Sequence, residues 1–373
     1  MTDRILVAMS GGVDSSVAAA LLQQAGWEVA GVTFKLFCYG GSDASAKACC
    51  GLEGVRDAQS TARRLGITHT VLDLSELFRV AVYDDFVREY TAGRTPNPCV
   101  QCNTHVKFGP LARWARERGF SHIATGHYVR SAVYRCESDR SERPVLARAR
   151  DARKDQSYVL WGLQPEILSR VQFPLGEMTK DEIRTEASRL ELPVWDKAES
   201  QDLCFAEGGS YVDVLRRELG EEHGVFAPGE IRDLDDRVLG RHLGLANYTV
   251  GQRKGLSLGG GEAYHVAALE PAGNVLRVAS VAEVSARRVE LTEVNLFVPR
   301  EEIQRGPVEA KIRYRHTAQA AVVSFDGDAA RVIFDEPQSA VAPGQSCVFY
   351  RDDLLLGGGR ILSTDAARDR TNR

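Results

Sequence analysis

The sequence lacks the features that mark membrane-spanning, secreted and strongly charged proteins. It contains no run of about 18 apolar residues, so we expect no transmembrane helix. Its first apolar stretch, residues 5–9, is too short for a signal peptide, and no cleavage site follows it. A net charge of −4 excludes a generally basic surface but permits a local basic face. We therefore expect a cytoplasmic protein that has no membrane partner.

The two commonest nucleotide-binding motifs are also missing. There is neither G-x-x-x-x-G-K-[ST] nor G-x-G-x-x-G, which excludes a P-loop lysine and a dinucleotide loop. Instead, the apolar stretch 5–9 reads as a buried strand, and it is followed by SGGVDSS at 10–16 and an Ala-rich helical run. Small residues at the start of a helix expose backbone N–H groups at the positive end of the helix dipole. We therefore predict a phosphate-binding turn, to which three serine hydroxyls can add donors.

Strand and helix patterns alternate as far as about Tyr128. The expected strands are 5–9, 28–35, 69–74 and 121–127, and the expected helices are 55–66, 75–91 and 107–119. Such alternation predicts an α/β fold with a doubly wound, Rossmann-like parallel sheet, in which ligands bind at the carboxyl ends of strands. Both the SGGVDSS turn and the sequence Thr125-Gly126-His127 follow such ends.

The remainder of the chain changes character twice, and 373 residues are too many for one core. A basic β-hairpin is expected at 128–149, then a helix at 179–192 that starts with a capping box of Thr179 and Glu182. Short alternating strands separated by turn residues near the end predict a small β-barrel. The predicted parts are 1–209, a small central domain at 210–283, the barrel at 284–364 and a flexible tail at 365–373.

Eight cysteines carry a second signal. Cys99 and Cys102 form a C-x-x-C in a proline-pinned loop, and Cys204 lies about a hundred residues further on. Polar neighbours flank Cys102 and Cys204, as they would flank exposed functional thiols. Three chemistries remain open: a persulfide-carrying thiol pair, an iron–sulfur cluster with one open iron, and zinc held by the three thiolates and His105. The other cysteines are interpreted as structural or incidental, with Cys49 and Cys50 unassigned: Cys38, Cys49, Cys50, Cys136 and Cys347.

Eight motifs in order resemble those of the bacterial tRNA-specific 2-thiouridylases, from about residue 4 to 362. They are SGGVDSS, PNPCxxCN, TGHY, KDQSY, SQDLCF, NYTVGQRKGL, IRYRH and PGQSCVFY. SGGVDSS alone resembles the pyrophosphate (PP) loop of the ATP-pyrophosphatase superfamily. The resemblance implies a PP-loop domain, a small central domain and a C-terminal β-barrel. It also implies a sulfurtransferase that uses ATP and Mg²⁺ to adenylate C2=O of a tRNA wobble uridine and convert it to C2=S, with sulfur from a donor protein or sulfide.

The resemblance further implies site residues. ATP would lie against Ala8, Met9, Ser10, Gly11, Gly12, Val13, Asp14, Ser15, Phe34 and Gly126. Asn97, Pro98 and Cys99 would line the target base, Cys102 would be the nucleophile, and Cys204 would receive the persulfide. tRNA would contact His127, Lys154, Asp155, Gln156, Arg313, Tyr314 and Gln345. Asp14 is the candidate for holding the metal.

One departure from the family pattern concerns Cys99, where many members have aspartate. Chains with C-x-x-C and a distant cysteine resemble the branch in which a 4Fe–4S cluster is ligated by Cys99, Cys102 and Cys204 and the free iron carries hydrosulfide. A third cysteine is unnecessary for a persulfide relay, which favours the cluster and leaves the relay as the alternative. Another PP-loop synthetase would not need the cysteine motifs. A non-catalytic tRNA-binding or redox protein would be expected to have a damaged loop, and 10–16 is intact.

Overall fold

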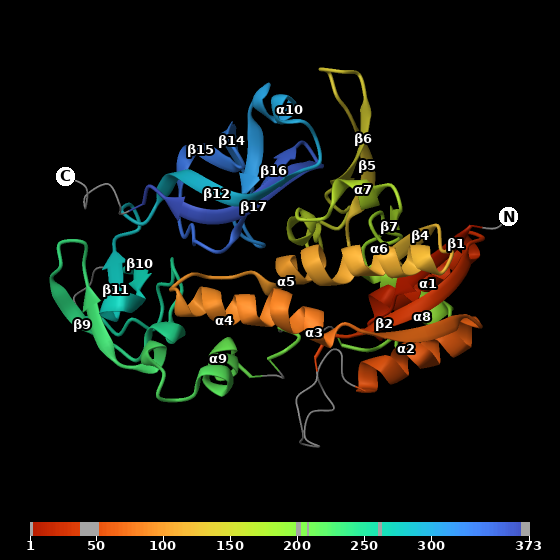
Figure 1. Cartoon of the computed structure of the whole chain (residues 1–373), viewed down its shortest axis with the longest axis horizontal. Helices are drawn as coiled ribbons and strands as arrows, with labels where there is room; N and C mark the ends of the chain where they lie inside the picture. The colour runs from red at the N-terminus through yellow and green to blue at the C-terminus, as the bar shows by residue number, and fades with distance from the viewer. Residues whose placement is uncertain (1–2, 38–51, 199–202, 207–208, 260–262, 367–373) are drawn as a thin grey trace. The chain divides into compact units, whose positions relative to one another are not determined.

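The computed structural model describes residues 3–37, 52–198, 203–206, 209–259 and 263–366 (Figure 1). The chain divides into two compact units. The first unit comprises Met1–Tyr83, Cys99–Gly209 and Asp353–Leu355, and the second comprises Asp84–Pro98, Ser210–Asp352 and Leu356–Arg373. Within the described residues, none of the helices has both the length and the apolar character needed to cross a bilayer.

The first unit is built on a parallel sheet, which has five strands among the described residues, in the order β3-β2-β1-β4-β7. The strands are β1 (Arg4–Ala8), β2 (Glu28–Lys35), β3 (Thr68–Asp73), β4 (His122–Thr125) and β7 (Val171–Gln172). The predicted α/β fold is confirmed. β1 pairs in parallel with β2 on one side and with β4 on the other, so the strand order reverses beside β1. This reversal is where open α/β sheets form their ligand-binding crevice.

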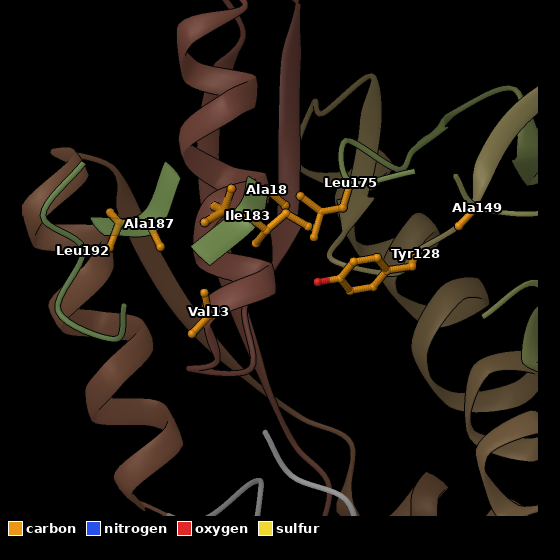
Figure 2. Packing of buried hydrophobic residues seen from close by; sticks show 9 residues of the cluster. Val13, Ala18, Tyr128, Ala149, Leu175, Ile183, Ala187 and Leu192 are labelled. Atoms are coloured by element: carbon orange, nitrogen blue, oxygen red, sulfur yellow. The ribbon is translucent and has the colours of Figure 1, made fainter. Parts of the chain in front are cut away.

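Several helices and a hairpin accompany this sheet in the first unit, in addition to the helical stretch with the cysteines that is described below. They are α1 (Val13–Gln24), α2 (Leu52–Leu65), α3 (Ser75–Phe78), η1 (Arg79–Tyr83), η3 (Ser157–Leu160), α7 (Pro165–Leu168) and α8 (Lys180–Arg189), with the hairpin β5 (Arg130–Arg135) and β6 (Glu142–Ala147). One buried cluster joins Val13 and Ala18 of α1 to Ile183 and Ala187 of α8 (Figure 2). Small side chains on α1 allow this close packing. The capping box predicted for α8 is present.

Two helix predictions need correction. The stretch 75–91 is helical throughout, but a π-helical segment, η1, separates α3 from α4 (Asp84–Thr91), and α4 belongs to the second unit. The loop expected around the C-x-x-C is instead helical from Pro98 onward, as α5 (Pro98–Gln101), the π-helix η2 (Cys102–Lys107) and α6 (Phe108–Glu117). Proline is accepted in a first helical turn because its missing N–H would have no partner there, so PNPC starts a helix.

The second unit contains the predicted barrel. Six of the described strands run in the order β12-β15-β14-β13-β16-β17, and antiparallel pairing of β12 with β17 closes the ring. They are β12 (Ala286–Leu296), β13 (Val308–Lys311), β14 (Gln319–Asp326), β15 (Ala329–Gln338), β16 (Ser346–Arg351) and β17 (Leu354–Thr364). Along β15, buried and exposed residues alternate, as expected for a barrel wall with a filled interior.

A separate sheet with its own core also belongs to the second unit. Among the described residues its strands run in the order β10-β11-β8-β9: β8 (Gly229–Arg232), β9 (Val238–His242), β10 (His265–Glu270) and β11 (Val275–Ala279). Ile231, Val266 and Leu276 are fully buried in its cluster. Short helices precede these strands or lie between them: α9 (Tyr211–Leu219), η4 (Gly224–Phe226), η5 (Leu245–Asn247), η6 (Pro271–Gly273) and α10 (Arg300–Gln304).

A buried ionic network holds α4 within the second unit. Arg360 of β17 donates to Asp85 at 2.9 Å, lies 3.2 Å from Glu89 and donates to Glu293 at 3.1 Å. Glu89 also accepts from Arg94 at 2.7 Å. Burial acts against ionisation of Glu89, but the Arg94 hydrogen bond and the Arg360 charge outweigh it and lower the pKa of this carboxyl. Separating α4 from β17 would leave buried charges without their partners, which costs free energy.

We predict that Arg360→Met lowers the free energy of unfolding of the protein by about 2–3 kcal/mol, because it removes the buried cation that Asp85 and Glu89 share and leaves only Arg88 and Arg94 to balance them. Urea unfolding followed by tryptophan fluorescence measures the change. The control Arg331→Met removes an arginine from a solvent-exposed pair with Glu290, and its effect should stay within about 1 kcal/mol. Equal effects of the two substitutions would contradict the proposed importance of the buried network.

Candidate active site

The turn after β1 depends on two glycines. Gly11 has φ +75°, and a Cβ built on it would lie 2.2 Å from the carbonyl oxygen of Gly54 on α2, so only glycine fits. Gly12 precedes α1 and has no side chain to cap the helix. The N–H groups of the first helical turn are therefore presented to an anion at the positive end of the helix dipole.

The serines of this turn do not act alike. Ser15 and Ser16 are buried, and their hydroxyls donate to the Gly12 carbonyl at 3.2 and 2.9 Å. Ser10 is exposed, and its backbone N–H donates to the Ser15 hydroxyl at 3.1 Å. The hydroxyls of Ser15 and Ser16 therefore stabilise the shape of the turn, and Ser10 is the serine at its open side.

Asp14, in the first turn of α1, is held from two directions. Its Oδ1 accepts from the Tyr128 hydroxyl at 2.7 Å and from Lys180 Nζ at 2.6 Å. Figure 2 shows Tyr128 in the same cluster as Val13, with its hydroxyl directed toward α1. Lys180 is largely buried and is the first residue of α8. The sequence analysis missed Lys180 and Tyr128, although the capping box before Lys180 and the TGHY motif were visible signals.

The remaining residues expected around ATP also come from strand ends. Gly126 follows β4, and a Cβ on it would lie 2.8 Å from the Ser15 backbone nitrogen. Ala8 ends β1, buried Met9 donates its N–H to the Val32 carbonyl at 2.8 Å, and Phe34 is buried near the end of β2. The carboxyl ends of β1, β2 and β4, which are neighbours in the sheet, thus lie side by side where the turn begins.

The cysteines of the C-x-x-C lie one helical turn apart. Cys99 is exposed, whereas Cys102 is buried, so the expectation that Cys102 is an exposed thiol was wrong. Its helix packs into the first unit, where Asn103 donates to the Val159 carbonyl at 3.0 Å. Cys204 is partly exposed, and its neighbour Phe205 packs edge-on against Phe78 and Tyr83. Residues 200–202 of the SQDLCF motif lie outside the described residues.

Lys107 adds positive charge near both cysteines. It is the last residue of the π-helix η2, and its charge acts on the thiols of Cys99 and Cys102. Burial raises the pKa of Cys99 and of Cys102, and the Lys107 charge opposes this rise for both thiols. The Cys99 side chain nonetheless has an exposed surface. Sequence periodicity could not have identified Lys107, because a π-helix is not encoded by an apolar repeat.

His127 belongs to the same electrostatic neighbourhood. Burial lowers the pKa of His127 to about 3, and the Lys107 charge acts in the same direction. Its Nδ1 lies 2.8 Å from the Thr125 hydroxyl, and its ring lies 5.7 Å from that of Phe108. His127 is therefore a neutral hydrogen-bonding group near neutral pH and not a cation.

The structure does not assemble either predicted metal site. In the part of the chain that is described, no three His, Cys, Asp or Glu side chains converge closely enough to hold a metal ion. Neither the 4Fe–4S ligand set of Cys99, Cys102 and Cys204 nor the zinc set that adds His105 is preformed among these residues, and both stay predictions. Lys107, beside two of these cysteines, favours negative charge on sulfur without a metal. Cys38, Cys49 and Cys50 lie outside the described residues.

Family models match the chain in three consecutive pieces. The descriptions are tRNA methyl transferase HUP domain over residues 3–208, tRNA methyl transferase PRC-barrel domain over 214–280, and aminomethyltransferase beta-barrel domain over 286–361. A protein named tRNA-specific 2-thiouridylase MnmA from Carboxydothermus hydrogenoformans is 43% identical over 96% of this chain and 97% of its own. The protein of that name from Moorella thermoacetica is 44% identical over 96% and 99%, respectively.

The chain belongs to the tRNA-specific 2-thiouridylase family. A solved structure described as the U34-tRNA thiolase NcsA from Methanococcus maripaludis with its [4Fe-4S] cluster covers 59% of this chain and 67% of its own, at 18% identity and a TM-score of 0.35. A likeness this weak supports no argument about the reaction or the cluster.

The residues that the family resemblance assigned to tRNA fall in both units. In the first unit, Asp155 is buried and accepts from the N–H groups of Ala149 and Ser157, and Gln156 accepts from the Tyr128 N–H at 2.9 Å. These two side chains stabilise the turn that carries partly exposed Lys154. In the second unit, Tyr314 is exposed, Arg313 donates to the Ser339 carbonyl at 2.9 Å, and Gln345 donates to backbone carbonyls.

We predict that Lys107→Gln slows alkylation of Cys99. Without the lysine charge the pKa of this thiol rises further. At a pH below the pKa, each unit by which the pKa rises lowers the thiolate fraction tenfold. Because the thiolate is the reactive form, iodoacetamide should react about three- to tenfold more slowly at pH 8. Peptide mass spectrometry measures the rate. Lys107→Arg should retain most of the rate, and Arg113→Gln, which removes an exposed charge from α6, should leave it unchanged. An unaltered rate in Lys107→Gln would contradict the electrostatic assignment.

We also predict that the His127 imidazole does not titrate between pH 5 and 8, because its folded-state pKa is about 3. Below the ordinary histidine pKa of about 6.5 the unfolded chain binds a proton that the folded chain does not, so folding stability falls as the pH falls from there toward 3. Histidine ring NMR shifts, assigned with His127→Gln, test this expectation. A ring titration near pH 6.5 would show that His127 is solvated.

Proposed function

We propose that the protein thiolates C2 of the wobble uridine of tRNA at the expense of ATP, with release of AMP and pyrophosphate. The observation that carries the proposal is the phosphate-accepting turn at 10–16, located where the strand order reverses, in the same unit as the cysteine helix. Two of the three family models are described as tRNA methyl transferase domains, and the relatives are named tRNA-specific 2-thiouridylases. The turn at 10–16 suits the activation of an oxygen by ATP, and the thiol side chains suit the transfer of sulfur that follows.

The turn serves the activation step. The C2 carbonyl of uracil is urea-like, and direct attack by sulfur would have to expel oxide. Transfer of AMP from ATP to this oxygen makes it part of a phosphate leaving group. Backbone N–H groups at the start of α1 would stabilise the negative charge that develops on the departing pyrophosphate.

Mg²⁺ would supply further positive charge to the phosphates when bound. This ion is commonly held by one or two carboxylates together with substrate phosphates, and Asp14 is the carboxylate in the turn. Because Oδ1 of Asp14 already accepts from Lys180 and Tyr128, its orientation is set before any ion arrives. Lys180 is close enough to Asp14 to balance its charge in the absence of a metal.

Sulfur transfer is proposed to follow through Cys204 and Cys102. The terminal sulfur of a persulfide on Cys204 attacks C2, and AMP leaves with the former C2 oxygen. Cys102 thiolate then attacks the Cys204 sulfur, the S–S bond to the base breaks, and its electron pair remains on the sulfur at C2. The products are 2-thiouridine and a Cys102–Cys204 disulfide, which a dithiol reductant returns to two thiols. We derive no step through an iron–sulfur cluster.

The three matched segments support a division into parts 1–209, 210–283 and 284–364, with 365–373 as a tail. We propose that Asn97, Pro98 and Cys99 line the base and that Lys154, Arg313 and His127 contribute to tRNA contact. A sulfur-donor protein that carries a persulfide would load Cys204, by passing its outer sulfur to the Cys204 thiolate and keeping the electron pair of the broken S–S bond on its own thiolate. Free sulfide would serve only the cluster alternative, and the reaction would take place in the cytoplasm.

The experiment supplies Mg²⁺, ATP, a persulfide-generating system and an unmodified transcript, and measures AMP and 2-thiouridine. We expect one AMP per thiolated nucleotide. Cys102→Ser and Cys204→Ser should each lower thiolation by more than about a hundredfold, because each removes a sulfur that the chemistry needs, with tRNA affinity within about twofold. Cys136→Ala, which alters a buried cysteine of the hairpin region, should retain activity.

Two results would overturn this proposal in different ways. Thiolated RNA formed without AMP would exclude adenylation. Iron and sulfide assays under anaerobic conditions test the relay: thiolation that depends on about four irons per chain, lost in Cys99→Ser, would replace the persulfide by a cluster. Iron-free protein that still thiolates tRNA would support the relay, and stoichiometric zinc would favour the site with His105.

A further inference from the structure

The segment that leads into the cysteine helix, Thr95–Pro98, has unusual backbone chemistry. Two of its residues, Pro96 and Pro98, have no N–H group, and each proline restricts the residue before it to an extended conformation. The three residues that precede α5, 95–97, therefore cannot form the hydrogen bonds of a regular strand or helix among themselves. It belongs to the second unit, and its carbonyl oxygens need donors from elsewhere in that unit.

Gln345, between β15 and β16, supplies those donors. Its Nε2 donates to the Thr95 carbonyl at 3.0 Å and to the Pro96 carbonyl at 3.1 Å. A side-chain amide nitrogen has two hydrogens, so both are engaged with this segment. The side chain that the family resemblance assigned to tRNA thus has no further donor to offer to a phosphate.

The backbone beside Gln345 reinforces the contact. The Thr95 N–H donates to the Pro343 carbonyl at 2.8 Å. Gly344 has φ +92°, and a Cβ on it would lie 2.9 Å from the Thr95 carbonyl oxygen, so a side chain would push the two segments apart. Gly344 and Gln345 are in turn bonded to the backbone of Ile361 in β17, at 2.8 and 2.7 Å.

The same strand holds the preceding helix. Arg360, next to Ile361, binds Asp85 and Glu89 of α4, and Glu89 binds Arg94. Consecutive points along 84–96 are therefore attached to β17, directly or through the 343–345 turn. The last attachment before Asn97 is made by Gln345.

We infer that Gln345 is a positioning residue that holds Thr95–Pro98 in the conformation in which Asn97 and Pro98 receive the target base, and that it contributes little to tRNA affinity. The inference rests on the proposed function for the identity of the base. The hydrogen bonds and the close approach at Gly344 carry the positioning role itself.

Gln345→Met tests the inference, because methionine has nearly the same length and shape but no donor. We expect kcat for thiolation to fall about ten- to a hundredfold, with the Kd for tRNA and its salt dependence within twofold of the parent. Hydrogen exchange of the peptide covering 94–97 should accelerate at least tenfold. Once the segment is no longer held by Gln345, the hydrogen bond from the Thr95 N–H to the Pro343 carbonyl should open more often. Gln345→Asn, which is too short to reach both carbonyls, should behave similarly.

Gln319→Met is the matched control in the same barrel. Gln319 also donates to a backbone carbonyl, that of Thr317, but at an exposed position, and its replacement should change none of these quantities. A tenfold weaker Kd with a smaller salt slope, and unchanged exchange at 94–97, would make Gln345 a tRNA contact and overturn the inference. Unchanged values throughout would overturn it as well. Exchange needs no substrate, so absence of thiolation by the parent protein would overturn the proposed function alone.

Discussion

The close approach of backbone segments at the end of β1 is the constraint on which the rest of the candidate site depends. Gly11 contacts the start of α2, and Gly126 contacts the start of α1, at distances that no Cβ would permit. These contacts bring the phosphate-binding turn, β4 and α2 to one point. The strand order reverses there, so the connections from β1 and from β4 lead away in opposite directions. The space between them leaves the N-terminus of α1 accessible to a ligand. A methyl group at either glycine would separate the elements that form the turn.

Charge in the first unit is arranged in pairs. Asp14 is matched by Lys180, and the cysteines at 99 and 102 have Lys107 beside them. Both lysines lie at irregular or terminal helix positions, one at the first residue of α8 and the other at the end of a π-helix. Such positions allow a side chain to leave the regular helical pattern. The site thereby combines fixed positive charge with thiols that burial alone would keep protonated.

The second unit has a different task in this scheme. Its barrel binds the stretch 84–98 at two places: a buried arginine binds carboxylates of α4, and a glutamine amide binds the proline-containing residues that follow α4. Arg360 interacts with carboxylates of α4, so separating α4 from β17 would leave buried charges unpaired. Gln345 donates hydrogen bonds to carbonyls that have no local partner because of the neighbouring prolines. The barrel therefore contributes to the geometry of the chain immediately before the cysteines, independently of any contact with RNA.

The sequence by itself determined the α/β fold, the barrel, the turn at 10–16 and the family, because these depend on local patterns: strand and helix periodicity, small residues after a strand, and motifs of fixed spacing. It also predicted the capping box of α8, which is a contact between neighbours in the chain. Only the tertiary structure decided that PNPC begins a helix and that Cys102 is buried. It also decided that Lys107 acts on the cysteines, that Lys180 binds Asp14 and that Gln345 binds the Thr95 and Pro96 carbonyls. Those outcomes depend on a π-helical insertion and on contacts between residues that lie up to 250 positions apart, which no local pattern records.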